Sequence, residues 1–237
     1  MNQPIRIARY LIYFLKRVST TRKEGARVKK NVTLGLFYLI GLFILSFGIS
    51  LMIIADLGAG PWDAFYVALA DLVGLTVGTW IFIIGILLIV INGVLMKKRP
   101  DFLAAITIII MSFLIDFWLL IAFGDFLISG VLARSLMLGG GILSIAAGVS
   151  LYLQANFAQN PIDGLMIAVH TRTGLSLSRS KTVLEVGILI VALVIGGPIG
   201  VGTVIVALGI GPLIQLFFGP ASKMKSRMIL PAAPMPK

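Results

Sequence analysis

The chain has 237 residues, of which 59% are hydrophobic and 12% are charged, with a formal net charge of +11, no cysteine and a mean hydropathy of +1.06. Soluble domains carry about 25% charged residues, so this composition excludes a water-soluble globular domain. The absence of cysteine from the sequence also excludes a disulfide framework, a thiol enzyme and a cysteine-bound metal site. We therefore predict an integral membrane protein that crosses the bilayer several times.

The positive charge is concentrated in clusters that border apolar stretches. Nine of the twenty Lys and Arg residues precede Val32, and further clusters lie at 97–99 and 223–227. This distribution is typical of cytoplasmic loops beside anionic lipid, and it argues against nucleic acid as the partner. The expected partners are the lipid bilayer and anionic lipid headgroups.

The first 31 residues form a basic amphipathic segment that we expect in the cytoplasm. At 100° per residue, Arg6, Arg9 and Lys16 of segment 5–18 lie on one helical face, opposite an apolar face. This pattern predicts a separate amphipathic helix at the membrane surface that binds anionic lipid headgroups. The alternative, a signal peptide, is disfavoured because Arg9 interrupts the apolar run and no small-residue cleavage site follows.

The membrane domain is predicted to occupy residues 32–220, followed by a basic cytoplasmic tail at 221–237. A spanning helix needs about 20 mostly apolar residues. Two shorter segments, 61–73 and 161–172, cannot cross at about 1.5 Å per residue, so we interpret them as half-helices that enter and leave on one side. Six stretches are long enough to cross: 32–56, 77–96, 102–123, 131–155, 177–197 and 199–220.

The basic residues also predict the orientation of these segments. With six crossings and the N-terminus inside, nineteen of the twenty Lys and Arg residues lie on the cytoplasmic side, and only Arg134 lies outside. The positive-inside rule therefore favours a multi-pass protein of the cell membrane with both termini in the cytoplasm.

The chain contains an internal repeat at an offset of 100 residues. Segments 41–75 and 141–175 share 10 identities in 35 positions, among them matched proline, aspartate, serine and glycine residues. Each copy, 32–123 or 131–220, holds three spans and one half-helix, and an odd number of crossings inverts the second copy. The predicted fold is therefore an all-α integral membrane protein with six transmembrane helices and two half-helices in two inverted three-helix repeats. In transporters with this plan, the functional centre lies at the repeat interface.

Both half-helices begin with the same short motif. Asp63 and Asp163 are the third helical residues, where a carboxylate can meet the free N–H groups of the first turn. The alternative is that these acids contact a ligand, with preference for a cation or a polar group. The predicted helix caps are Gly60 and Pro61 in the first copy and Asn160 and Pro161 in the second.

Two further acids lie inside predicted spans, where an acidic side chain is costly unless it faces a partner or a cavity. Glu185 either pairs with Lys181, four residues away, or lines a pathway. Asp116 has no basic residue in its own span, so it either accepts a hydrogen bond from another helix or is protonated.

Other patterns indicate structure rather than chemistry. Gly140, Ser144 and Gly148 form a stripe of small residues that predicts close helix contact. The turn GGPIGVGT at 196–203 lacks the GK[ST] ending of a phosphate loop. His170 is the only histidine, and no catalytic grouping occurs in the sequence, so we expect no enzyme, no cofactor and no metal.

Four segments together resemble one known family: LGAGPWDAF (57–65), NPIDGLMIAV (160–169), SRSKTVLEVG (178–187) and GGPIGVGT (196–203). They are similar to the YczE/YyaS/YitT family of small bacterial multi-pass membrane proteins, over roughly residues 35–220. The resemblance implies a bacterial cytoplasmic-membrane protein but supplies no substrate. The sequence departs from a symmetric pattern after the second span, where KKRPDFLAAITI replaces the glycine-rich turn.

The favoured function is a small-molecule permease or exporter with a small-molecule or ion substrate. The alternative is a membrane scaffold or regulator of a cytoplasmic enzyme, for which the basic N-terminal segment would be the docking surface. A second copy of the chain is a further possible partner, in a homodimer. In the permease interpretation, Asp63 and Asp163 flank one central site from opposite faces, and Arg179, Glu185 and Asp116 line or gate it. The candidate substrate pathway comprises Trp62, Asp63, Asp116, Asn160, Asp163, Arg179 and Glu185.

Overall fold

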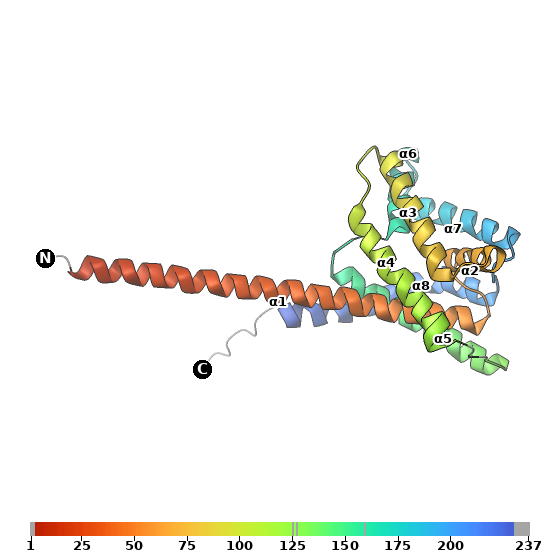
Figure 1. The fold of residues 1–237 in the computed structure, drawn as a ribbon, viewed down its shortest axis with the longest axis horizontal. Coiled ribbons are helices and arrows are strands. Elements are labelled where there is room, and N and C mark those ends of the chain that lie inside the picture. Colours follow the sequence, from red (N-terminus) through yellow and green to blue (C-terminus); the bar gives the residue numbers. More distant parts are fainter. Residues whose placement is uncertain (1–2, 125, 127, 159, 230–237) are drawn as a thin grey trace.

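A computed structural model describes residues 3–229 except 125, 127 and 159, with side chains described from Arg27 onward. The described residues form helices and connecting turns, without strands, so the all-α prediction is confirmed for them. In chain order the helices are α1 (Gln3–Ala55), α2 (Pro61–Val73), α3 (Val77–Met96), α4 (Phe102–Asp116), the short π-helix η1 (Phe117–Ala122), α5 (Val131–Gln154), α6 (Pro161–Thr173), α7 (Leu177–Val194) and α8 (Val201–Ile229) (Figure 1).

Five of the described helical segments are long and apolar enough to cross a membrane: Arg27–Ala55, Val77–Met96, Phe102–Ala122, Val131–Gln154 and Val201–Ile229. The protein is therefore a multi-pass membrane protein by helix length and composition. The sixth predicted span corresponds to α7, which has 18 residues and contains Arg179, Lys181 and Glu185. Because of these three charged residues, α7 is not among the five segments that are apolar enough to cross a membrane.

The N-terminal segment is not a separate helix. Residues 5–18 belong to α1, which continues for 53 residues, about 80 Å at 1.5 Å per residue. The N-terminal part of α1 extends away from the other helices (Figure 1). The prediction of a separate element was wrong because no proline interrupts the chain between the amphipathic segment and the first span. Binding of residues 5–18 to anionic headgroups remains a prediction.

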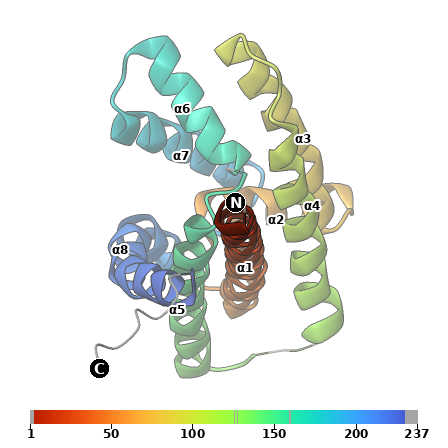
Figure 2. The same cartoon turned by 90° about the vertical axis from the view of Figure 1, so that its left-hand side faces the viewer.

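The contact between α1 and α5 depends on four glycines. A Cβ atom on Gly48 would lie 2.6 Å from the carbonyl oxygen of Gly141, and a Cβ on Gly148 would lie 2.7 Å from that of Gly41. These distances leave no room for a methyl group between the two backbones. Figure 2, seen along α1, shows this helix between α5 and α4.

The predicted stripe of small residues on the helix now identified as α5 was only partly correct. Gly148 faces α1, but a Cβ on Gly140 would meet no atom within 4 Å. The contacting face instead contains Gly141, one residue further along and therefore about 100° around the helix. A spacing pattern alone does not indicate which face of an apolar helix meets its neighbour.

The two short helices have the ends that the sequence predicts. Gly60 and Asn160 precede α2 and α6, and each helix has a proline at its first position. Both helices end at a glycine in the left-handed conformation, Gly74 at φ 85° and Gly174 at φ 74°. This is the usual termination of a helix by glycine. The four predicted cap positions are thus confirmed as helix starts.

Corresponding helices also make corresponding contacts. The short helix α2 packs against α7, while the short helix α6 packs against α3. Asp56 and Asn156, which are 100 residues apart, lie just after α1 and α5 and both have a φ of 51°, an uncommon value for residues other than glycine. The buried core lies mainly between α1 and α5 and includes Leu42, Met52 and Ile142. These contacts bring the start of α2 and the start of α6 to the middle of the helix bundle.

Candidate functional site

A cavity of about 80 Å³, here called the central cavity, lies where the beginnings of α2 and α6 approach each other. Trp62, Asp63 and Tyr66 of α2 line it, together with Asn160 and Pro161 at the start of α6. Side chains of α1, α3 and α4 complete the wall, and most of them are aliphatic. The cavity has room for a few water molecules or a small ligand.

The segment that leads into α2 is held by backbone hydrogen bonds to the turn that precedes α8 and to the first residues of α8. The N–H of Ala59 donates to the carbonyl oxygen of Pro198 at 2.9 Å, and the N–H of Gly202 donates to that of Leu57 at 2.8 Å. A Cβ atom on residue 60 would lie 2.8 Å from Oδ2 of Asp63. Glycine at this position therefore leaves room for the carboxylate beside the first turn of its own helix.

The Asp63 carboxylate has no ion-pair partner among the described residues. A carboxylate in a largely apolar wall is unfavourable unless a cation, a proton or several donors accompany it. Trp62 contributes a buried Nε1–H that also lacks a hydrogen-bond partner in the described part of the chain. The central cavity thus contains a carboxyl group without an ion-pair partner, next to a tryptophan whose buried N–H has no hydrogen-bond partner in the described part of the chain. Elsewhere in that part of the chain, no three His, Cys, Asp or Glu side chains group as metal ligands.

The start of α6 is anchored by Asn92 of α3. The side-chain amide of Asn92 donates to the carbonyl oxygen of Pro161 at 2.8 Å, and Oδ1 of Asn160 accepts from the N–H of Ile162 at 3.0 Å. A Cβ on Gly164 would lie 2.7 Å from Nδ2 of Asn92, so the two helices touch closely here. Asn92 therefore positions the α6 end of the cavity.

The predicted pair of acids does not flank one cavity. Asp163 lines a second cavity of about 230 Å³, together with Tyr152 and Asn156 at the end of α5. The charges of Lys181 and Glu185 are close enough to act on this carboxylate. The pairing of Asp163 with Asp63 was wrong because α6 presents its first two residues to the central cavity, and its third residue faces away.

Glu185 and Arg179 lie outside the central cavity. Lys181 and Glu185 form an ion pair at 3.6 Å, with 55% and 32% of the two side chains exposed. This geometry agrees with the ion-pair interpretation of Glu185. Arg179 contributes its backbone N–H, which donates to the Ser176 hydroxyl at 3.2 Å and caps α7.

Asp116 binds the beginning of α3. Its carboxylate accepts a hydrogen bond from the Thr76 hydroxyl at 2.6 Å and another from the N–H of Gly78 at 2.8 Å. The first N–H groups of a helix have no partner within the helix, and a carboxylate from another helix satisfies them. The interhelical hydrogen bond is therefore confirmed, and Asp116 does not line the central cavity.

Two polar residues of the site region were missed as site residues from the sequence. Thr107 lines the central cavity, and its hydroxyl is 2.6 Å from the buried hydroxyl of Tyr38. A lone threonine in an apolar span carries no sequence signal, because β-branched residues are common there. Asn92 did carry a signal, since it is the single amide within its span.

The chain is similar to several bacterial proteins. A family profile described as "Family of unknown function (DUF6198)" matches residues 33–219. The chain is 37% identical to "Uncharacterized protein YyaS" of Bacillus subtilis (strain 168), over 77% of this chain and 90% of that protein. It is 34% identical to "Uncharacterized membrane protein YczE" of the same organism, over 76% and 82%. It is 27% identical to an "Uncharacterized protein" of Haemophilus influenzae, over 76% and 80%.

These relatives confirm the resemblance to YyaS and YczE that the sequence motifs indicated. No solved structure matches the chain.

Proposed function

The chain belongs to the family of unknown function DUF6198, and from this premise we propose that it is a small-molecule permease or exporter of the bacterial cell membrane. The proposal rests on one observation, the cavity at which the starts of two short helices meet beside the unpaired carboxylate of Asp63. Short helices that end inside a bundle are the elements with which transporters build their substrate sites. We further propose that the protein has no enzymatic activity.

We propose that the two halves form inverted repeats. The reciprocal contacts support this, because Gly48 approaches Gly141 while Gly148 approaches Gly41. The packing of α2 against α7 and the corresponding packing of α6 against α3 support the inverted repeats as well. A two-fold axis in the membrane plane would produce such pairs of contacts. In this arrangement α7 is the sixth crossing, and both termini lie in the cytoplasm.

The central cavity favours a ligand that both donates and accepts hydrogen bonds. The carboxylate of Asp63 would attract an ammonium group or a hydroxyl, and the indole N–H of Trp62 would bind an acceptor on the same ligand. Asn160 also lines this cavity, and its side-chain oxygen accepts a hydrogen bond from the N–H of Ile162. Asp163, in the second cavity, would be a separate contact for the substrate, near the charges of Lys181 and Glu185.

A thermal-shift screen of the purified protein against small metabolites and ions tests this proposal. A ligand at a hundred times its Kd stabilises a protein by about 2.7 kcal/mol. We expect Asp63→Asn to lose the shift, and the matched control Asp71→Asn to retain it, because Asp71 is exposed at the other end of α2. The proposal fails if a ligand that stabilises the wild type stabilises Asp63→Asn equally. It also fails if Asp63→Asn, Asp163→Asn and Glu185→Gln all leave every measurable phenotype intact.

The alternative is a membrane scaffold or regulator of a cytoplasmic enzyme. The observation that favours it is the projection of α1 beyond the other helices as one continuous helix (Figure 1). Deletion of residues 1–26 separates the two functions. A scaffold would lose its function with this segment, whereas a permease would keep most of its transport.

A further inference from the structure

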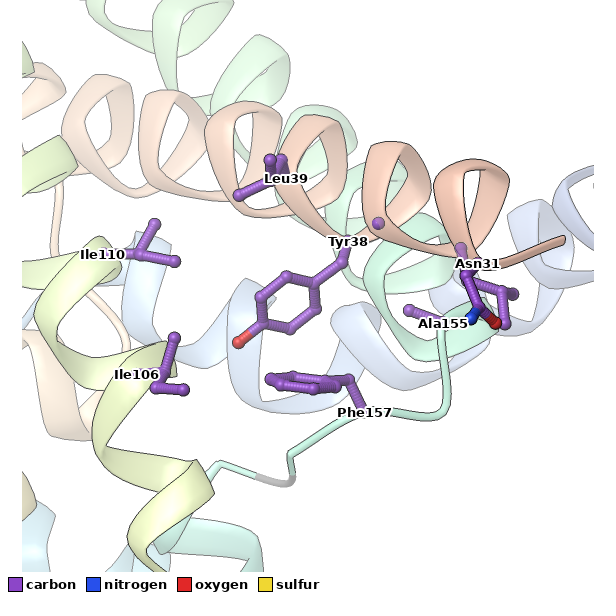
Figure 3. Close-up of a pocket in the computed structure, with 9 residues that line it drawn as sticks. Asn31, Tyr38, Leu39, Ile106, Ile110, Ala155 and Phe157 are labelled. Carbon is purple, nitrogen blue, oxygen red and sulfur yellow. The ribbon is translucent and has the colours of Figure 1, made fainter. Parts of the chain in front are cut away.

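A third space, with largely apolar walls, is shown in Figure 3. It lies between α1, α4 and the turn that follows α5, has a volume of about 500 Å³, and is called here the α1–α4 groove. Its walls are almost entirely hydrocarbon. They include Leu34 and Leu39 of α1, Ile106 and Ile110 of α4, and Phe157.

Tyr38 forms the floor of the groove without making it polar. Its ring projects from α1 towards α4 and lies beside Phe157, with the two ring centroids 5.1 Å apart in an edge-to-face arrangement. Its hydroxyl is 2.6 Å from that of Thr107, and both residues are buried. The only polar atom of the tyrosine side chain is thus already paired, so the floor presents hydrocarbon to an occupant.

One end of the groove is polar and lies close to cationic residues. Asn31 lines this end (Figure 3), and Arg27 lies one helical turn earlier on the same face of α1, where it is exposed. A second cation is nearby, because Nζ of Lys225 donates to the carbonyl oxygen of Gln154, the residue before groove-lining Ala155. The apolar groove therefore ends at an amide, and two cationic residues lie close to that end without lining the groove.

We propose that the α1–α4 groove binds a phospholipid with an anionic headgroup. One acyl chain occupies the apolar part, and the phosphate lies at Asn31 and Arg27. The volume falls in the range of about 300–1,000 Å³ that is typical of small-molecule sites. Water would not occupy an apolar space of this kind stably, and a guanidinium group binds phosphate in a charge-assisted pair. This inference does not depend on the proposed transport function.

Gly35 allows the groove to be filled without disturbing the fold. It lines the groove, and a Cβ atom on it would meet nothing within 4 Å. Leucine at this position would project into the space of the acyl chain, and the loss of a glycine from a helix interior favours folding. Gly187 of α7 provides the matched control, because a Cβ there also meets nothing within 4 Å and the residue lies outside the groove.

The test is native mass spectrometry of the full-length protein in detergent, titrated with phosphatidylglycerol or with phosphatidylcholine. We expect the wild type to retain one phosphatidylglycerol in preference to phosphatidylcholine. Gly35→Leu should weaken its apparent affinity by about tenfold or more, equivalent to about 1.4 kcal/mol, while Gly187→Leu binds as the wild type does. Arg27→Gln should still retain a lipid but lose the preference for the anionic headgroup.

Three results would overturn the proposal. The first is wild-type binding of phosphatidylglycerol by Gly35→Leu. The second is an equal loss of binding in Gly187→Leu. The third is a change of oligomeric state in Gly35→Leu with lipid retention unaltered, which would assign the groove to a second copy of the chain.

Discussion

The crossing of α1 and α5 yields the most direct prediction, because it depends on contacts between backbones. In Gly148→Ala, the new methyl group would lie 2.5 Å from the backbone nitrogen of Leu45 and 2.7 Å from the carbonyl oxygen of Gly41. Ordinary van der Waals contact begins at about 3.4 Å, so the helices must separate by roughly 0.9 Å. Neither obstructing atom belongs to a side chain that could rotate away.

The expected cost follows from this displacement. Overpacking a close contact costs about 1–3 kcal/mol, and the neighbouring contacts along the same crossing are loosened at the same time. Replacing a helical glycine by alanine also contributes about 1 kcal/mol in favour of folding. Gly140→Ala gains this second effect alone, because its methyl group would meet nothing within 4 Å on the same helix. The gain from replacing glycine is common to both variants and cancels, so we expect Gly148→Ala to be less stable than Gly140→Ala by the overpacking cost of about 1–3 kcal/mol.

Thermal unfolding of the purified variants in one detergent measures this difference. A change of 1 kcal/mol shifts Tm by about 2–4 °C in a chain of this size. Gly48→Ala is the reciprocal variant, and it should show a similar loss because its Cβ would lie 2.6 Å from the oxygen of Gly141. Equal stability of Gly148→Ala and Gly140→Ala would refute the close crossing.

Three further substitutions have defined outcomes. Asp116→Ala should lower the free energy of unfolding by about 1–3 kcal/mol, because the N–H of Gly78 and the Thr76 hydroxyl lose their acceptor. Chemical denaturation measures this loss against Asp71→Ala, a control at an exposed position. Equal stability of the two variants would contradict the prediction. Tyr38→Phe should cost about 1 kcal/mol, since the buried hydroxyl of Thr107 loses its partner; no change in Tm would mean that another group satisfies it. Glu185→Gln should change stability by less than about 1 kcal/mol, because its ion pair is partly exposed, and a larger loss on unfolding in detergent would indicate a role beyond that pair.

Much of the local structure was predictable from the sequence. The proline at the first position of α2 and α6 and the glycine after each helix mark the ends of both short helices. These signals act within a few residues, because a fixed φ or a left-handed glycine limits the backbone directly. The apolar stretches indicated the membrane helices, because the thickness of the bilayer sets the number of apolar residues that a spanning helix needs.

The surroundings of the acids were decided by the tertiary structure. Asp63 and Asp163 hold the same place in their helices, yet only Asp63 lines the central cavity. The difference arises because different segments hold the two helices: Asn92 holds the start of α6, and the turn at Pro198 holds the start of α2. Sequence alone determined a multi-pass helical protein with two short, capped helices. Only the packing of distant segments set the rotation of each helix, and that rotation determines which cavity a side chain enters.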